Sequence, residues 1–169
     1  MSDHDEIDAL AAGLIGELVV AGKTTATAES CTGGWIAKAL TDVNGSSQCF
    51  GYGVVSYSNS AKELMLGVSP ETLAQNGAVS EAVVAEMASG ILALSGADYS
   101  VAVSGIAGPD GGTDDKPVGT VWIAWAVGTG NEISIDAKLH HFSGDRDGVR
   151  SQTVIVALQG LRERLKQGG

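Results

Sequence analysis

Helical and strand patterns alternate along this 169-residue chain, which predicts one layered α/β domain with helices on both sides of a mixed sheet. Two observations support this fold class. Residues 99–103 form a nearly continuous apolar run, as expected of a strand that is covered on both faces. Polar, glycine-containing segments follow several predicted strands, where open α/β sheets place their ligands. We therefore expect a single domain over residues 1–169.

The first third of the chain predicts four elements. Apolar residues recur between Ile7 and Val19 at the spacing of an amphipathic helix that faces a core. Residues 25–28 predict a short strand, and residues 35–40 open a second helix after two glycines. A further strand is expected over residues 52–57.

The next helices have recognisable ends. Ser58 can cap a short helix that ends at Gly67, and Pro70 suits the first position of another. Ser80 can cap a longer helix that runs through Ile91.

The last part of the chain predicts a strand pair and a closing helix. After the strand at 99–103 comes a glycine-rich loop over residues 104–112. Residues 118–127 and 133–142 predict an antiparallel pair joined around residues 128–131. Apolar residues from Val149 to Leu161 then predict the final helix.

Composition excludes several classes of protein. The formal net charge is −10, so the basic footprint of a nucleic-acid-binding protein is missing, and we expect no nucleic-acid partner. No segment is apolar for the roughly 20 residues that a membrane span needs. The N-terminus carries acids where a signal peptide needs bases, which predicts a cytoplasmic location. Cys31 and Cys49 match neither a disulfide framework nor a metal motif.

The first segment that can carry chemistry is Ala28–Gly34. A hydroxyl between a strand end and a helix start lies among free backbone N–H groups, which can stabilise an oxyanion or bind a phosphate. Ser30 or Thr32 can equally be a simple helix cap. Cys31 is a rival nucleophile, although a lone cysteine is more often a small buried packing residue.

The second segment runs from Tyr57 to Lys62. A lysine deprotonates a serine only if burial or nearby positive charge lowers the pKa of its amine, and most helix lysines are solvated instead. No lysine stands three residues after Ser30, which excludes the Ser-x-x-Lys arrangement of β-lactamases.

The glycine-rich loop at 104–112 lacks the residue order of a P-loop. Three aspartates within or after it have no EF-hand spacing and are expected to be solvated: Asp110, Asp114 and Asp115.

Two further pairs remain open. His140 and His141 are adjacent on a strand and face opposite sides, so one of them could be a general base. Arg146 and Arg150 are four residues apart on the last helix and could share a face that binds phosphate, or be solvated.

Five segments in order resemble the nicotinamide-nucleotide amidases, the family that includes the C-terminal domain of the competence/damage-inducible protein CinA. They are AESCTGG, YGVVSYSNSAK, GAVSEAVVAEMA, SGIAGPDGGTDDKPVGTVWIAW and FSGDRDGVR. The resemblance runs from about residue 25 into the last helix and shows no departure at the motif positions. The large N-terminal domain of many CinA proteins is absent, so we expect a stand-alone amidase.

The resemblance implies a three-layer α/β/α sandwich with a mixed, mostly parallel sheet. It also implies hydrolysis of nicotinamide mononucleotide to nicotinate mononucleotide and ammonia, in pyridine-nucleotide salvage, without metal or cofactor. By the same resemblance Ser30 is the nucleophile, Lys62 its base and Tyr57 a partner in proton transfer. Residues expected to contact the substrate are Cys31, Thr32, Gly33, Gly34, Asn59, Ser104, Gly105, Arg146 and Arg150.

Two alternatives stay open at this point. One is a nucleotide-binding regulatory module, linked to competence or DNA damage, that lacks catalysis. The other is an amidase or esterase for a different small amide. The expected partner is a small nucleotide, and the sequence leaves open whether the chain forms a homo-oligomer.

Overall fold

The centre of the computed structural model, which describes residues 1–168, is a five-stranded sheet in the order β2-β1-β3-β4-β5. The central strand β1 is parallel to β2 and β3, whereas β3–β4 and β4–β5 are antiparallel. The predicted mixed sheet is confirmed, with its parallel part on one side and its antiparallel part on the other. The strands are β1 (Thr25–Glu29), β2 (Phe50–Val55), β3 (Tyr99–Gly105), β4 (Thr120–Thr129) and β5 (Glu132–His141).

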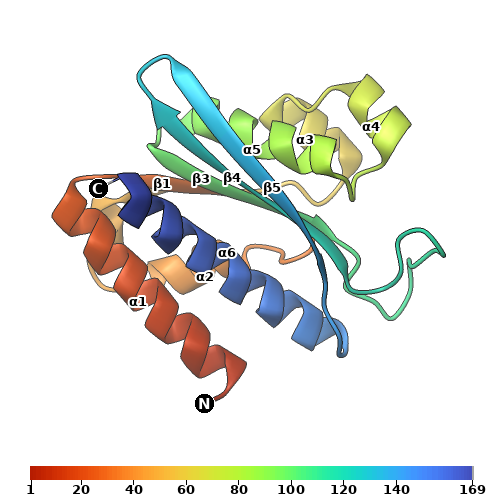
Figure 1. Ribbon diagram of the computed structural model, residues 1–169, viewed down its shortest axis with the longest axis horizontal. Coiled ribbons are helices and arrows are strands. Elements are labelled where there is room, and N and C mark those ends of the chain that lie inside the picture. The colour runs from red at the N-terminus through yellow and green to blue at the C-terminus, as the bar shows by residue number, and fades with distance from the viewer. Residues whose placement is uncertain (169) are drawn as a thin grey trace.

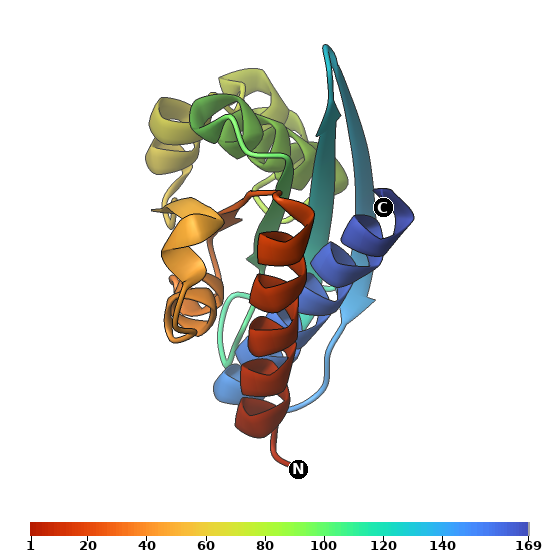
Figure 2. The same cartoon turned by 90° about the vertical axis from the view of Figure 1, so that its left-hand side faces the viewer.

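Helices cover both faces of this sheet, so the predicted three-layer α/β/α sandwich is confirmed (Figure 1, Figure 2). One face carries α1 (Asp3–Ala21), α2 (Trp35–Thr41) and α6 (Arg146–Gly168). The other face carries α3 (Asn59–Leu66), α4 (Pro70–Asn76) and α5 (Glu81–Ser95). A single 3₁₀ turn, Ser46–Gln48, leads into β2. Among residues 1–168, none of the helices is long and apolar enough to cross a membrane.

Each outer layer has its own apolar core. Leu14 and Leu18 of α1 pack with Leu158 of α6 on one face of the sheet, where these side chains are almost fully buried. Met87 and Ile91 of α5 pack on the other face, against strands whose inward residues there are mostly alanine. Small strand residues allow α5 to lie close to the sheet.

The predicted helix caps are present. The Ser58 hydroxyl accepts a hydrogen bond from the Ala61 N–H (3.1 Å), and the Ser80 hydroxyl accepts one from the Val83 N–H (3.3 Å). Gly67 ends α3 in the left-handed conformation, with φ of 69°.

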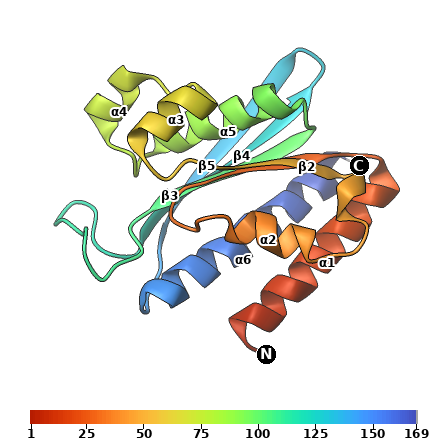
Figure 3. The same cartoon turned by 180° about the vertical axis from the view of Figure 1, so that it is seen from behind.

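Every strand has bounds that differ by one or two residues from the prediction, and two of these differences lie near Ser30. β2 stops at Val55 because its pairing with β1 ends at Glu29, so Tyr57 lies beyond the strand and not at its end. β3 continues to Gly105, because the pairing of Gly105 with Val121 keeps this end in the sheet. The connecting loop therefore starts at Ile106 and projects beyond the sheet (Figure 1, Figure 3).

The strand order creates a switch point at β1. The chain leaves β1 through α2 on one face to reach β2, and later returns through α5 on the opposite face to β3 (Figure 3). The connections thus diverge beyond the carboxyl ends of β1 and β3, which is where open α/β sheets bind ligands. Ser30 lies at this place, and its N–H donates to the Val103 carbonyl (3.1 Å).

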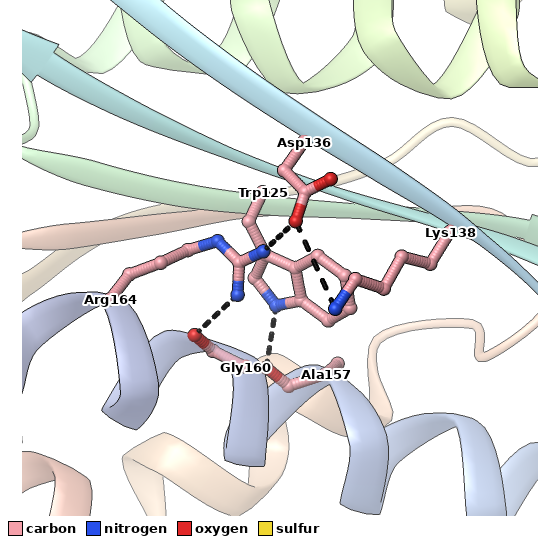
Figure 4. A network of polar contacts seen from close by, with 6 residues as sticks. All are labelled: Trp125, Asp136, Lys138, Ala157, Gly160 and Arg164. Atoms are coloured by element: carbon pink, nitrogen blue, oxygen red, sulfur yellow. Dashed lines mark hydrogen bonds and ion pairs between the residues drawn. The ribbon is translucent and has the colours of Figure 1, made fainter. Parts of the chain in front are cut away.

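A tight contact fixes α6 on the sheet. The Trp125 indole N–H donates to the Ala157 carbonyl (3.0 Å), and the Arg164 guanidinium lies 4.2 Å from the ring centroid (Figure 4). A Cβ atom on Gly160 would lie 2.2 Å from the nearest Trp125 ring atom. This position of α6 therefore has room only for glycine.

We expect Gly160→Ala to lower the free energy of unfolding by about 1–3 kcal/mol, because the methyl group forces the buried indole to move. Urea denaturation of the folded variants measures this difference. Gly16→Ala in α1 is the matched control, since a Cβ there meets no atom within 4 Å and alanine favours the helix. Equal effects of the two substitutions would contradict the contact argument.

Candidate active site

Ser30 and Lys62 meet although they are 32 residues apart in the sequence. The Lys62 ammonium nitrogen lies 3.0 Å from the Ser30 Oγ and 2.9 Å from the Ser56 carbonyl, with the Tyr57 carbonyl at 3.4 Å. Ser30 follows β1, and Lys62 lies one turn into α3, which begins just after β2. Adjacent parallel strands therefore bring the two side chains together.

Lys62 is buried to an unusual degree for a lysine. Lys62 is 1% exposed, and this burial lowers the pKa of its amine. Among residues 1–168, the opposing influence on this pKa is Cys31, which raises it in its thiolate form. A lowered pKa raises the fraction of neutral amine, which is the form that can take a proton from a serine.

A buried carboxylate anchors the turn that carries Ser30. Glu29, which is 1% exposed, accepts hydrogen bonds from the Thr32 hydroxyl (2.6 Å) and from the N–H groups of Ile36 (2.8 Å) and Ala37 (3.0 Å). Burial raises the pKa of Glu29, while these donors act in the opposite direction. Glu29 thus caps α2 from the end of the strand and fixes the intervening turn.

The sequence analysis missed Glu29 and the Ser56 carbonyl. An acid just before a glycine-containing helix start was a readable signal for the first, because acids favour helix N-termini. Every residue has a backbone carbonyl, so the sequence gives no sign of which one contacts Lys62. The role of the Ser56 carbonyl could be found only from the structure.

Cys31 is poorly suited to be the nucleophile. Its residue is 6% exposed, and burial raises the pKa of the thiol to about 12. At neutral pH the sulfur is therefore protonated and unreactive. The geometry favours the packing alternative for Cys31 over the thiol mechanism.

Unpaired backbone donors follow Ser30 in the turn that leads to α2. Within residues 1–168, the N–H groups of Cys31 and Thr32 have no hydrogen-bond acceptor. Gly33 (φ 61°) and Gly34 (φ 101°) hold the turn in conformations that side chains with a Cβ rarely adopt. The arrangement leaves donors available for an oxyanion beside the candidate nucleophile.

The two predicted arginines both reach this region. Arg150 donates to the carbonyls of Cys31 (3.0 Å) and Thr32 (3.1 Å), and its guanidinium lies 5.6 Å from the Trp35 ring centroid. Arg146 donates to the Gly108 carbonyl (2.8 Å). Neighbouring turns of α6 thus hold both guanidinium groups near the carboxyl edge of the sheet.

Tyr57 is 61% exposed, and its hydroxyl accepts a hydrogen bond from Arg146 (3.2 Å). The part of Tyr57 near Lys62 is the backbone carbonyl. A role of its hydroxyl in proton transfer stays a prediction.

Two hollows flank the arginines. One, of about 520 Å³, lies between residues 107–109 of the loop and the start of α6. The other, of about 360 Å³, lies over the turn at residues 32–35 and is also bordered by His4 and Lys38. Arg150 lines both. A larger groove of about 840 Å³ between α1 and the end of α6 holds none of the predicted site residues.

The other predicted residues have diverse positions. Ser104 and Gly105 end β3 beside β1, and Asn59 is the exposed first residue of α3. His140 and His141 lie on β5, which β3 and β4 separate from β1 by about 14 Å at the usual strand spacing. This distance disfavours either histidine as the base for Ser30. Among residues 1–168, no three metal-ligating side chains cluster.

The candidate site combines a buried serine–lysine pair with unpaired N–H groups at the switch point of an α/β sheet. These are the groups that an acyl-transfer site needs. The family model described as the CinA C-terminal domain matches residues 7–165. The chain therefore belongs to the CinA C-terminal domain family, as its sequence motifs predicted.

Named relatives resemble the chain over most of their length. The nicotinamide-nucleotide amidohydrolase PncC of Escherichia coli K12 is 58% identical over 146 residues, which are 86% of this chain and 87% of that protein. The protein of the same name from Pseudomonas putida is 55% identical over 135 residues, 80% of this chain and 82% of its own. The crystal structure of the competence/damage inducible protein CihA from Agrobacterium tumefaciens has a TM-score of 0.90 at 42% identity, covering 95% and 96% of the two chains.

The burial of Lys62 predicts a pH dependence of stability. Between its lowered folded-state pKa and its unfolded value of about 10.4, the unfolded chain binds more protons, so the free energy of unfolding rises with pH. Lys62→Met removes this contribution. We therefore expect the stability of the unsubstituted protein, relative to Lys62→Met, to increase as the pH is raised toward 10 in urea denaturation.

Lys38→Met is the matched control. Lys38 is exposed, and its hydrogen bond with Asp42 raises its pKa, so this variant should not reproduce the trend. A stability difference for Lys62→Met that does not change with pH would contradict a lowered pKa at that position.

Proposed function

We propose that this chain is a nicotinamide-nucleotide amidase that converts nicotinamide mononucleotide to nicotinate mononucleotide and ammonia. The observation that carries the proposal is the 3.0 Å contact between the buried Lys62 amine and the Ser30 hydroxyl. Amidohydrolase names among relatives more than half identical supply the substrate. Hydrolysis of an amide needs an activated nucleophile, oxyanion donors and a proton for the leaving nitrogen, and the site offers a group for each.

The mechanism begins with a neutral Lys62 amine. It takes the Ser30 proton as Oγ attacks the carboxamide carbon, and the N–H groups of Cys31 and Thr32 stabilise the resulting oxyanion. The Lys62 ammonium returns the proton to the amide nitrogen, the C–N bond breaks, and ammonia leaves. Lys62 then takes a proton from water as the water oxygen attacks the acyl ester. The Lys62 ammonium returns this proton to the Ser30 Oγ as the acyl–oxygen bond breaks, which releases the nicotinate product and restores the neutral amine.

The arginines supply a binding site for the phosphate. A guanidinium has five N–H donors, and Arg146 and Arg150 each use two on protein oxygens, so donors remain for an anion. The Gly33–Gly34 turn lets the ligand come close to the backbone. Binding energy at the phosphate can orient the carboxamide at Ser30. Asn59 and the Ser104–Gly105 strand end complete the proposed contacts.

The remaining parts of the proposal concern the cellular setting. We place the chain as a single amidase domain over residues 1–169, acting in the cytoplasm in pyridine-nucleotide salvage. The partner is the small nucleotide itself. The serine–lysine chemistry uses no metal and no cofactor, because the two side chains and water supply every proton and bond in the cycle.

We expect Ser30→Ala and Lys62→Met each to lower kcat for ammonia release from nicotinamide mononucleotide by about a thousandfold or more, since the two residues act as one unit. Combining them should add little to either single loss. Cys31→Ala is the neighbouring control and should keep most activity, with all variants checked for folding by circular dichroism. Activity retained in Ser30→Ala but lost in Cys31→Ala would assign the reaction to the thiol. If the unsubstituted protein binds the nucleotide without releasing ammonia, the regulatory alternative holds.

The phosphate contacts predict a preference that can be measured. The unsubstituted enzyme should use nicotinamide mononucleotide far better than nicotinamide riboside, judged by kcat/KM. Arg150→Gln should reduce that preference by about tenfold or more, because a charge-assisted hydrogen bond is worth about 1.5–3 kcal/mol. Arg162→Gln, which loses a contact with Glu17 far from Ser30, is the control. An unchanged preference in Arg150→Gln would move the phosphate elsewhere.

A further inference from the structure

The outermost strand β5 is an open edge. It pairs with β4 on one side, and no other strand of residues 1–168 lies on its outer side. Nearly all of its ten residues are exposed, including Ile133, Ile135 and Leu139, which are 40–47% exposed. A long edge strand with exposed apolar side chains favours pairing with another strand.

The register of β4 and β5 shows which backbone groups are open. The Phe142 N–H donates to the Gly119 carbonyl (2.9 Å), just beyond the paired strands. Because directions alternate along a strand, the even-numbered residues of β5 bond to β4. The odd-numbered residues from Ile133 to His141 therefore direct their N–H and C=O groups outward.

The side chains divide between the two faces of the sheet. Asp136 and Lys138 lie on the α6 face, where Asp136 accepts a hydrogen bond from Arg164 and its Oδ2 is 4.0 Å from the Lys138 amine (Figure 4). Ile135 and Leu139 lie on the opposite face. Each face of the edge thus has its own chemistry: one charged, the other apolar.

We propose that β5 pairs with β5 of a second copy, antiparallel about a two-fold axis at Ala137, so that two sheets become one. In this register Asp136 of each copy faces Lys138 of the other, which makes two opposite-charge pairs. Ile135 of each copy packs against Leu139 of the other on the opposite face. The outward groups of the odd-numbered residues supply the ladder of hydrogen bonds.

Other registers fit less well. A two-fold axis at Asp136 sets that carboxylate against its copy, and one at Lys138 sets two ammonium groups together. An axis at Ile135 pairs Lys138 with Glu132 but places Leu139 opposite the turn residue Asn131. The axis at Ala137 alone among these four matches both the charged and the apolar face.

The side chains of Asp136 and Lys138 are exposed enough to contact a second copy. Both side chains are about half exposed, 54% for Asp136 and 56% for Lys138. Arg164 and Lys138 contact only Oδ2 of Asp136, and within residues 1–168 the oxygen Oδ1 has no partner. The Lys138 amine can turn from its long contact toward a second copy, while Arg164 keeps Asp136 in place.

The charge pattern gives a decisive experiment by sedimentation velocity. The unsubstituted chain should form dimers, whereas Asp136→Lys and Lys138→Asp should each raise the dimer dissociation constant by about tenfold or more, because like charges then meet. An equimolar mixture of these two variants should recover dimers, since a mixed pair restores opposite charges at both positions. Circular dichroism and ammonia release check that each variant is folded, and neither residue contacts the Ser30 site.

Cysteine cross-linking tests the register. Ala137→Cys should form an intermolecular disulfide on mild oxidation, since paired residues at the axis have Cα atoms about 5.5 Å apart. Ile135→Cys, which faces residue 139 of the other copy, is the matched control and should not. The native Cys31 and Cys49 are buried and leave a low background. A monomeric unsubstituted chain, dimers that both charge variants leave intact, or equal cross-linking at 135 and 137 would overturn the proposal.

Discussion

Burial of the Lys62 amine is the constraint on which the rest of the site depends. A lysine that is 1% exposed needs oxygen partners, and the carbonyls after β2 and the Ser30 hydroxyl provide them. Those partners are together only because β1 and β2 are adjacent and parallel and α3 begins directly after β2. The sheet order, the Ser58 cap and the lowered pKa of the amine are therefore parts of one arrangement.

Glu29 plays the matching part on the other side of Ser30. It joins the end of β1 to the first turn of α2 through two hydrogen bonds and to Thr32 of the intervening turn through a third, so this turn cannot shift without breaking them. Burial moves the pKa of Glu29 upward and that of Lys62 downward, so both groups move toward their neutral forms. In the proposed mechanism, a serine held between such groups needs little reorganisation when charge develops on the substrate oxygen.

The local patterns of this chain predicted its fold well, because helix caps and hydrophobic periodicity are signals over a few residues. Ser58, Pro70 and Ser80 mark helix starts that the structure confirms. The ends of β2 and β3 were off by up to two residues, since pairing with a neighbour decides where a strand stops. By itself, the ordinary behaviour of a helix lysine predicted a solvated Lys62, and only the family motif pointed to the site. Its burial depends on residues 32 positions away.

The two halves of the sheet contribute to the candidate site in different ways. The parallel half, β2-β1-β3, ends beside Ser30, and the helix α3 that follows β2 carries Lys62 to it. The antiparallel half, β4-β5, carries the Trp125 contact that fixes α6, and α6 in turn holds Arg146 and Arg150 over the site. The position of the arginines thus depends on packing at the far side of the sheet. Because Arg164 lies on Trp125 and also binds Asp136, the outer strand is connected to the same helix that carries Arg146 and Arg150.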